Sequence, residues 1–365
     1  MIDVEKVVAA AESDAAQWDR DGLPDEMITL AAQTGLLGAD RSVTFGGAGV
    51  DSRALGRIAA TLGECCTSLR SLVTVHGMVA AALDRWGTAE QRRDWLPRLT
   101  AGEVVAALAA TESGAGTDLA GVATTFEDDA ADRLVSGHKL WVTFGQVADV
   151  FLVLGAAAGG LCAALVERDR PGISVEPIEG QLGMRGARLA HIRFDRVRIP
   201  VAQLIAPPGF GLSHVIGTAL DHGRFTVAWG SVGIARACLA DAAAHAATRV
   251  QSGTALAEHQ LIRATLGRCW VDVEGAQAMC ERATDDRIAG SPHALIATIA
   301  AKYAASRAAA AVSERAVQVL GAAGCAPDSR VGRFYRDAKV MQIIEGTQEV
   351  AEVTIGERVL RGARW

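Results

Sequence analysis

The amino-acid sequence predicts an α+β chain of three parts: an N-terminal all-α domain over residues 1–105, a central β-barrel domain over 106–208, and a C-terminal four-helix bundle over 209–365. Three observations predict this organisation. The 365 residues accommodate two or three domains at about 100–200 residues each. Helical periodicity gives way to short apolar runs near residue 105 and returns near residue 205. Hydrophobic residues make up 50% of the chain and aromatics only 5%, so aliphatic side chains must build the core.

The N-terminal part has the periodicity of successive helices. One apolar face runs through Ile28, Leu30 and Leu36, and glycines at 35 and 38 end the segment. Further helices are predicted over residues 54–69 and 71–86, the second ending before Gly87. Thr88 is the predicted N-cap of the helix that follows.

The central part alternates short apolar runs with turn signals. The segment RLVSGHKLWVT predicts a hairpin around Ser136 and Gly137. Residues 150–166 are uncharged and fall at the short limit for a membrane span. Their glycine-rich centre instead predicts two buried strands joined by a tight turn. The segments ISVEPI and LAHIRFDRVRIP add strands, which together favour a small barrel or sandwich.

The C-terminal part returns to long alanine-rich helices. Ser291 and Pro292 are the predicted N-cap and first residue of a helix that continues to Gly321. Long helices in succession, with apolar faces rich in alanine, predict a closely packed bundle.

Composition excludes several classes of protein. The net charge of −6 argues against binding nucleic acid through phosphate neutralisation. The first residues lack the apolar block of a signal peptide, so a cytoplasmic location without a membrane is expected. The seven cysteines lack metal-site spacing, so free thiols and no metal site are expected. No G-x-G-x-x-G, P-loop, H-E-x-x-H or G-x-S-x-G motif occurs. A redox cofactor would therefore have to bind without a Rossmann unit.

Two segments of the central part have the composition of a ligand site. In TESGAGTD, from Thr111, small residues leave backbone amides and hydroxyls open to a ligand; the alternative is an ordinary turn. In KLWVTFG, Trp141 and Thr143 would point the same way on a strand and suit a flat heteroaromatic ring with a polar edge. The alternative is a core tryptophan beside a strand-forming threonine.

A third segment, RDAKVMQIIEGT, carries a candidate general base. Ile343 and Ile344 precede Glu345, and apolar surroundings would desolvate its carboxylate. Desolvation raises a carboxyl pKa towards neutrality, which suits proton abstraction. Gly346 allows close approach of a ligand. The alternative is a helix end with a solvated Glu345 and Gly346 as its cap.

In this order and spacing, the three segments resemble those of the acyl-CoA dehydrogenase family, and WGTAEQRRDWLPRLTAGE and VQVLGAAGC extend the resemblance across almost the whole chain. The resemblance implies an FAD-dependent α,β-dehydrogenation of an acyl thioester. FAD would bind between the β domain and the helix bundle, and an electron-accepting flavoprotein or O₂ would reoxidise it. Glu345 would be the catalytic base that removes the α-proton, while the β-hydrogen leaves as hydride to flavin N5 and the Glu345 amide donates to the thioester oxygen.

The resemblance also implies roles for further residues. Expected flavin contacts are Thr111, Gly116, Thr117, Trp141, Val142 and Thr143. The pyrophosphate and adenine would be held, partly by a second subunit of a homodimer or homotetramer, by Arg249, Gln260, Gln318, Gly321 and Thr347. The substrate would be bordered by Thr117, Asp221, Arg224 and Gly346.

The chain departs from the family pattern at Ser113, Phe144, Ser252 and Glu349. Arg70 and His76 lie on the expected acyl-pocket helix, where they would favour a short, polar acyl group; the alternative is that both face solvent or cap a helix. The chain thus resembles the dehydrogenases of polyketide extender-unit pathways, such as methoxymalonyl synthesis, which act on acyl carrier protein.

Three functions remain open at this point. The first is dehydrogenation of a short, polar acyl thioester carried by CoA or by acyl carrier protein. The second is a flavin-dependent oxidase or monooxygenase on the same fold. The third is a non-catalytic binding protein.

Overall fold

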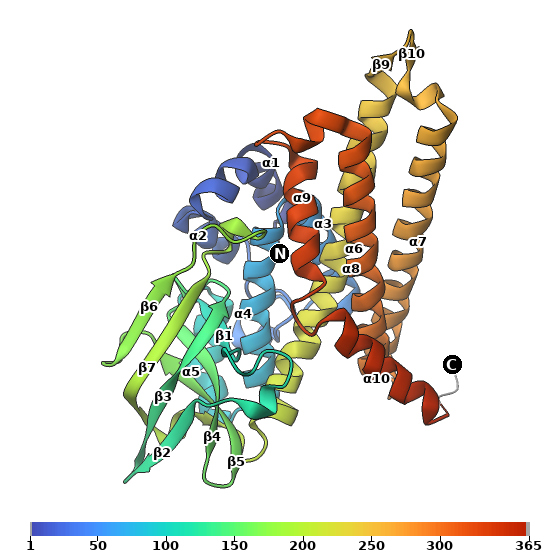
Figure 1. Ribbon diagram of the computed structural model, residues 1–365. Helices are drawn as coiled ribbons and strands as arrows, with labels where there is room; N and C mark the ends of the chain where they lie inside the picture. The colour runs from blue at the N-terminus through green and yellow to red at the C-terminus, as the bar shows by residue number, and fades with distance from the viewer. Residues whose placement is uncertain (1, 363–365) are drawn as a thin grey trace.

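The computed structural model describes residues 2–362. In Figure 1 a helical N-terminal part and a β-sheet lie beside a tall bundle of C-terminal helices, which confirms the predicted fold class. The N-terminal helices are α1 (Val4–Asp21), α2 (Asp25–Gln33), α3 (Ser52–Cys65), α4 (Thr67–Trp86) and α5 (Ala89–Thr100).

Side-chain caps fix where several of these helices begin. The Asp51 carboxylate accepts a hydrogen bond from Ala54 N at the start of α3. Thr88 forms a capping box with Gln91 at the start of α5, as the sequence predicts. The predicted break near residue 70 is wrong, because the chain breaks at Cys66. That residue has extended backbone angles (φ −153°, ψ 112°), and α4 then runs unbroken to Trp86.

The central part is one sheet with the strand order β6-β7-β3-β2-β4-β5-β8, and β1 pairs in parallel with β4. Its two end strands do not pair with each other among residues 2–362, so the barrel is open. The strands are β1 (Ala106–Ala109), β2 (Thr125–Asp129), β3 (Asp132–Val142), β4 (Val150–Ala157), β5 (Gly160–Glu167), β6 (Ile173–Pro177), β7 (Ala190–Pro200) and β8 (Leu204–Ile205).

One predicted hairpin is confirmed and one is wrong. Strands β4 and β5 pair antiparallel from Val150↔Glu167 to Ala157↔Gly160, as predicted for residues 150–166. No turn forms at Ser136 and Gly137, because β3 continues through them. Gly137 instead allows close packing, since a Cβ there would lie 2.1 Å from Thr124 Oγ1.

The C-terminal part contains α6 (Gly217–Thr248), α7 (Gln260–Ile288), α8 (Ala294–Leu320), α9 (Arg330–Met341) and α10 (Gln348–Leu360), with the short hairpin β9 (Val250–Gln251) and β10 (Thr254–Ala255) at its tip. The start of α8 differs from prediction: Ser291 Oγ accepts from His293 N in a turn, and the helix begins at Ala294. Helix α8, with the turn after it, is apolar and long enough to cross a membrane by length and composition, but it packs within the bundle (Figure 1).

The contact between α3 and α6 is unusually close because glycines line it. A Cβ on Gly63 of α3 would lie 2.3 Å from the Gly230 carbonyl oxygen of α6. A Cβ on Gly233 would lie 2.1 Å from the Ala60 carbonyl oxygen. Helix α6 also contributes to all three hydrophobic clusters of the described residues, through Ala219, Phe225 and Val227 among others.

The Gly63→Ala variant is expected to lose about 1–3 kcal/mol of unfolding free energy, because the added methyl would force the two backbones apart. Chemical denaturation measures the loss. The matched control is Gly356→Ala on α10, where no described residue lies within 4 Å of the added Cβ, and it should gain up to about 1 kcal/mol from helix propensity. Equal stabilities of Gly63→Ala and wild type would contradict the close packing.

Candidate active site

Glu345 lies on the tight turn between α9 and α10. Its backbone is left-handed (φ 57°), and the φ of Gly346 is also positive (96°). Two cations hold the turn: half-buried Arg224 donates from Nε to the Glu345 carbonyl oxygen at 2.8 Å, and buried Lys302 donates from Nζ to the Gly346 carbonyl oxygen at 2.7 Å. The turn is therefore fixed from α6 and from α8.

The carboxyl group of Glu345 points into the protein. A Cβ on Gly223 would lie 2.9 Å from Glu345 Oε2 and 2.8 Å from Met78 Sδ, so this glycine makes room for the carboxyl. Oε2 is buried and has no hydrogen-bond partner within residues 2–362. Burial raises the pKa of Glu345 to about 6, against the opposing charges of Arg224 and Lys302. The group can therefore take up a proton near neutral pH, as the sequence predicts.

Backbone amides beside this carboxyl are available to a ligand. Among residues 2–362, no acceptor is hydrogen-bonded to the N–H groups of Glu345 or Gly346. Thr347 follows as the N-cap of α10, and its hydroxyl accepts from Val350 N. Unpaired amides at a helix N-terminus are suited to oxyanions.

Sequence reasoning missed Lys302. It is 2% exposed, and burial lowers its pKa to about 8. The available signal was a lone lysine within an apolar, alanine-rich helix.

Of the predicted substrate contacts, Arg224 and Gly346 lie at this turn, whereas Asp221 Oδ2 is engaged by Arg287 Nη1 at 2.6 Å.

A buried ion pair, also missed, joins the two predicted ligand segments of the β domain. Glu112 accepts from Lys139 Nζ at 2.6 Å and from Thr124 N at 3.0 Å. Leu140 N donates to the Thr111 carbonyl oxygen at 2.8 Å. The loop beyond Glu112 is open: Gly116 and Thr117 are exposed, and nothing lies within 4 Å of a Cβ built on Gly116.

Trp141 presents an exposed ring at the end of β3. It is 54% exposed, has a φ of 56°, and its backbone N–H donates to His191 Nδ1 at 3.3 Å. Val142 is buried against the sheet, so only its backbone can meet a ligand. Thr143 lies on the turn after the strand and is half-buried. The exposed indole and the open glycine loop fit a flat ring system such as a flavin.

Four predicted cofactor residues lie far from Glu345 in the same chain: Arg249, Gln260, Gln318 and Gly321. All four are exposed. Arg249 and Gln260 flank the β9–β10 hairpin in the chain, and Gln318 and Gly321 lie at the end of α8. Along α6, Arg249 is about 37 Å from Arg224. One chain therefore does not bring the two groups together.

The structure separates the roles of Arg70 and His76. Arg70 is 1% exposed and bonds to Thr74 Oγ1 at 3.0 Å and to Met341 Sδ at 3.2 Å. His76 Nε2 bonds to the Leu99 carbonyl oxygen at 3.0 Å, and its Nδ1 accepts from Ala106 N at 3.2 Å. His76 thus ties α4 to its neighbours. Neither side chain faces solvent or caps a helix.

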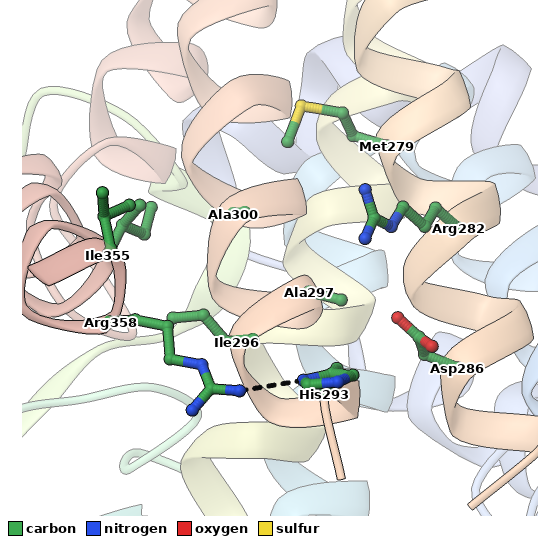
Figure 2. Close-up of a pocket in the computed structure, with 10 residues that line it drawn as sticks. Met279, Arg282, Asp286, His293, Ile296, Ala297, Ala300, Ile355 and Arg358 are labelled. Atoms are coloured by element: carbon green, nitrogen blue, oxygen red, sulfur yellow. Dashed lines mark hydrogen bonds between the residues drawn. The ribbon is translucent and has the colours of Figure 1, made fainter. Parts of the chain in front are cut away.

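Another hollow, of about 140 Å³, lies between α7, α8 and α10 (Figure 2). It is lined mainly by apolar side chains, including Met279 and Ile355, with Arg358 bonded to His293 at 3.1 Å. None of the predicted site residues lines it. It has no base beside open backbone amides, so the site at Glu345 is the better candidate for chemistry.

Comparison with known proteins identifies the architecture. Three family models match in succession: the acyl-CoA dehydrogenase N-terminal domain at residues 4–103, the middle domain at 107–197 and the C-terminal domain at 210–360. The chain belongs to the acyl-CoA dehydrogenase family. Enzymes of this family use FAD to dehydrogenate acyl thioesters between Cα and Cβ, and they pass electrons to an electron-transferring flavoprotein.

Similar proteins include acyl-CoA dehydrogenases from a mammal and a bacterium. The mitochondrial short-chain specific acyl-CoA dehydrogenase of Mus musculus is 30% identical over 357 residues, covering 96% of this chain and 86% of the relative. The probable acyl-CoA dehydrogenase FadE25 of Mycobacterium tuberculosis is 31% identical over 364 residues, covering 98% and 92%.

Two solved structures are similar over nearly their full length. FkbI, for biosynthesis of the methoxymalonyl extender unit of the FK520 polyketide, is 37% identical with a TM-score of 0.91, and the match covers 98% of this chain and 99% of that one. Butyryl-CoA dehydrogenase from Megasphaera elsdenii is 27% identical with a TM-score of 0.92, covering 99% of both chains.

Proposed function

We propose that the chain catalyses FAD-dependent α,β-dehydrogenation of a short, polar acyl thioester with Glu345 as the catalytic base. The observation that carries the proposal is the inward-facing Glu345 carboxyl, which has a pKa raised to about 6 and an unpartnered Oε2. A carboxylate with this pKa is deprotonated at pH 7 yet basic enough to accept a proton from carbon.

Two groups of Glu345 act on the thioester. The carboxylate accepts the α-proton, and the free backbone N–H donates to the thioester oxygen as negative charge develops there. Trp141, Thr111 and the open 111–118 loop would hold FAD, which would supply the acceptor for the hydrogen that leaves Cβ with its electron pair. The enoyl thioester forms as the Cα–H and Cβ–H bonds break.

The surroundings of Arg70 support the proposal that the acyl group of the substrate is polar. The arginine is buried next to α6, where a Cβ on Gly230 would lie 2.8 Å from Arg70 Cδ, and no carboxylate pairs with it among residues 2–362. Thr74 links it to Thr226 through hydroxyls 3.0 Å apart. Burial of an unpaired guanidinium is costly. Of its five N–H donors, two are engaged within the protein, and an oxygen-bearing acyl end would engage more.

The similarity to FkbI supports acyl carrier protein as the carrier and polyketide extender-unit synthesis as the pathway. The separation of Arg249 from Glu345 supports a homodimer in which each chain supplies Arg249, Gln260, Gln318 and Gly321 to its partner's cofactor. An arginine fork suits pyrophosphate because it donates parallel hydrogen bonds.

The Glu345→Gln variant should retain FAD and lose turnover by about 10²-fold or more, since an amide cannot accept the α-proton. Flavin absorbance measures cofactor content, and anaerobic mixing with substrate measures flavin reduction. Substantial remaining turnover would exclude Glu345 as the base.

Mixing two inactive variants tests the shared site. Arg249→Ala chains lack the cofactor contact and Glu345→Gln chains lack the base, so mixed dimers rebuild one complete site. Co-expression should recover up to about half of the wild-type activity per dimer, whereas separately purified variants stay inactive. No recovery in verified mixed dimers would contradict sharing.

A matched pair of thioesters tests the acyl group. With 4-hydroxybutyryl and butyryl groups, each on CoA and on acyl carrier protein, wild type should reduce flavin at least about tenfold more efficiently with the hydroxylated group. Arg70→Met should abolish that preference, and Arg57→Met, at an exposed position of α3, should keep it. A wild-type preference for butyryl would contradict the polar pocket and leave the role of Glu345 intact.

A further inference from the structure

Lys302 places a buried amine beside the candidate base Glu345. Its Nζ bonds to the Gly346 carbonyl oxygen at 2.7 Å, and no carboxylate lies within ion-pair distance of it among residues 2–362. The preceding carbonyl, that of Glu345, is held by Arg224. Two consecutive carbonyls of one turn are thus bound by cations from two different helices.

The turn needs such support because its backbone is strained. A left-handed conformation at a non-glycine residue costs about 1–2 kcal/mol, and Glu345 has a φ of 57°. The Lys302 bond fixes the peptide plane after Gly346, and the Arg224 bond fixes the plane before it. Of these two planes, the one held by Arg224 adjoins the Glu345 Cα and helps to set the direction in which the carboxyl leaves the backbone. Lys302 anchors the next plane of the same turn and so holds the turn in place.

We propose that protonated Lys302 is a positioning residue that holds the Glu345–Gly346 turn in its catalytic conformation, and that loss of its proton ends the enzyme's working pH range on the alkaline side. The proposal rests on the proposed function of Glu345. It requires no contact between Lys302 and substrate, because the ammonium acts through the Gly346 carbonyl.

The charged groups around Lys302 determine the direction in which activity changes with pH. Burial lowers the pKa of Lys302 to about 8, while Glu345 raises it, Arg224 of α6 lowers it and Glu349 of α10 raises it. Asp221 of α6 and Arg287 of α7 neutralise each other nearby. Lys302 is therefore charged below about pH 8, where it also lowers the pKa of Glu345. Activity should rise through about pH 6 and fall through about pH 8.

The test compares the pH profiles of flavin reduction in the holoenzyme for wild type, Lys302→Met and Lys302→Arg, with Lys6→Met on α1 as the control. Lys302→Met should lower kcat at least about tenfold with little change in KM and move the acid limb above pH 6. Lys302→Arg keeps a charge that does not titrate, so it should lose the alkaline limb and keep the acid limb. Lys6→Met should match wild type.

A second readout is independent of turnover. Infrared difference spectra of each variant against the same variant carrying Glu345→Gln report the protonated Glu345 carboxyl, whose titration should move upward in Lys302→Met. A wild-type profile in Lys302→Met, or an alkaline limb near pH 8 retained in Lys302→Arg, would overturn the proposal. Failure of Glu345 as the base would appear separately, as turnover in Glu345→Gln.

Discussion

The close packing of α6 against the N-terminal helices is the constraint on which the site depends. Gly63 and Gly233 lack the side chains that would hold the α3 and α6 backbones apart. The same face of α6 then leaves room for Arg70 at Gly230 and for the Glu345 carboxyl at Gly223. Helix α4 thus forms a wall of the candidate active site, because its Met78 lies beside the Glu345 carboxyl at Gly223.

Around Glu345, burial and charge oppose each other. Arg224, Lys302 and Arg70 all favour the carboxylate, yet the pKa is raised, so desolvation outweighs three cations. An unpaired buried carboxyl in apolar surroundings would shift further. The cations therefore moderate the shift and keep the group ionised at neutral pH, while the two that bond to backbone carbonyls also fix the turn. Charge and geometry at this site come from the same side chains.

Much of the fold could be predicted because residues close together in the sequence determine the helix ends and turns. Thr88 caps its helix through a three-residue spacing, and the glycine-rich centre of residues 150–166 forms the expected turn. The break at Cys66 and the uninterrupted strand through Gly137 were missed, because packing from other segments determines them. Glu345 was predicted from its apolar neighbours. Lys302 was missed because its partner is a backbone carbonyl 44 residues away, which no local pattern reveals.

Helix α6 has side chains in every hydrophobic cluster of the described chain, and its middle portion is buried on all sides. A helix shared in this way cannot leave one cluster without opening the others. The three parts of the chain are therefore coupled through one helix, although the sequence divides into three distinct segments. An isolated N-terminal fragment would expose the apolar face that α6 normally covers.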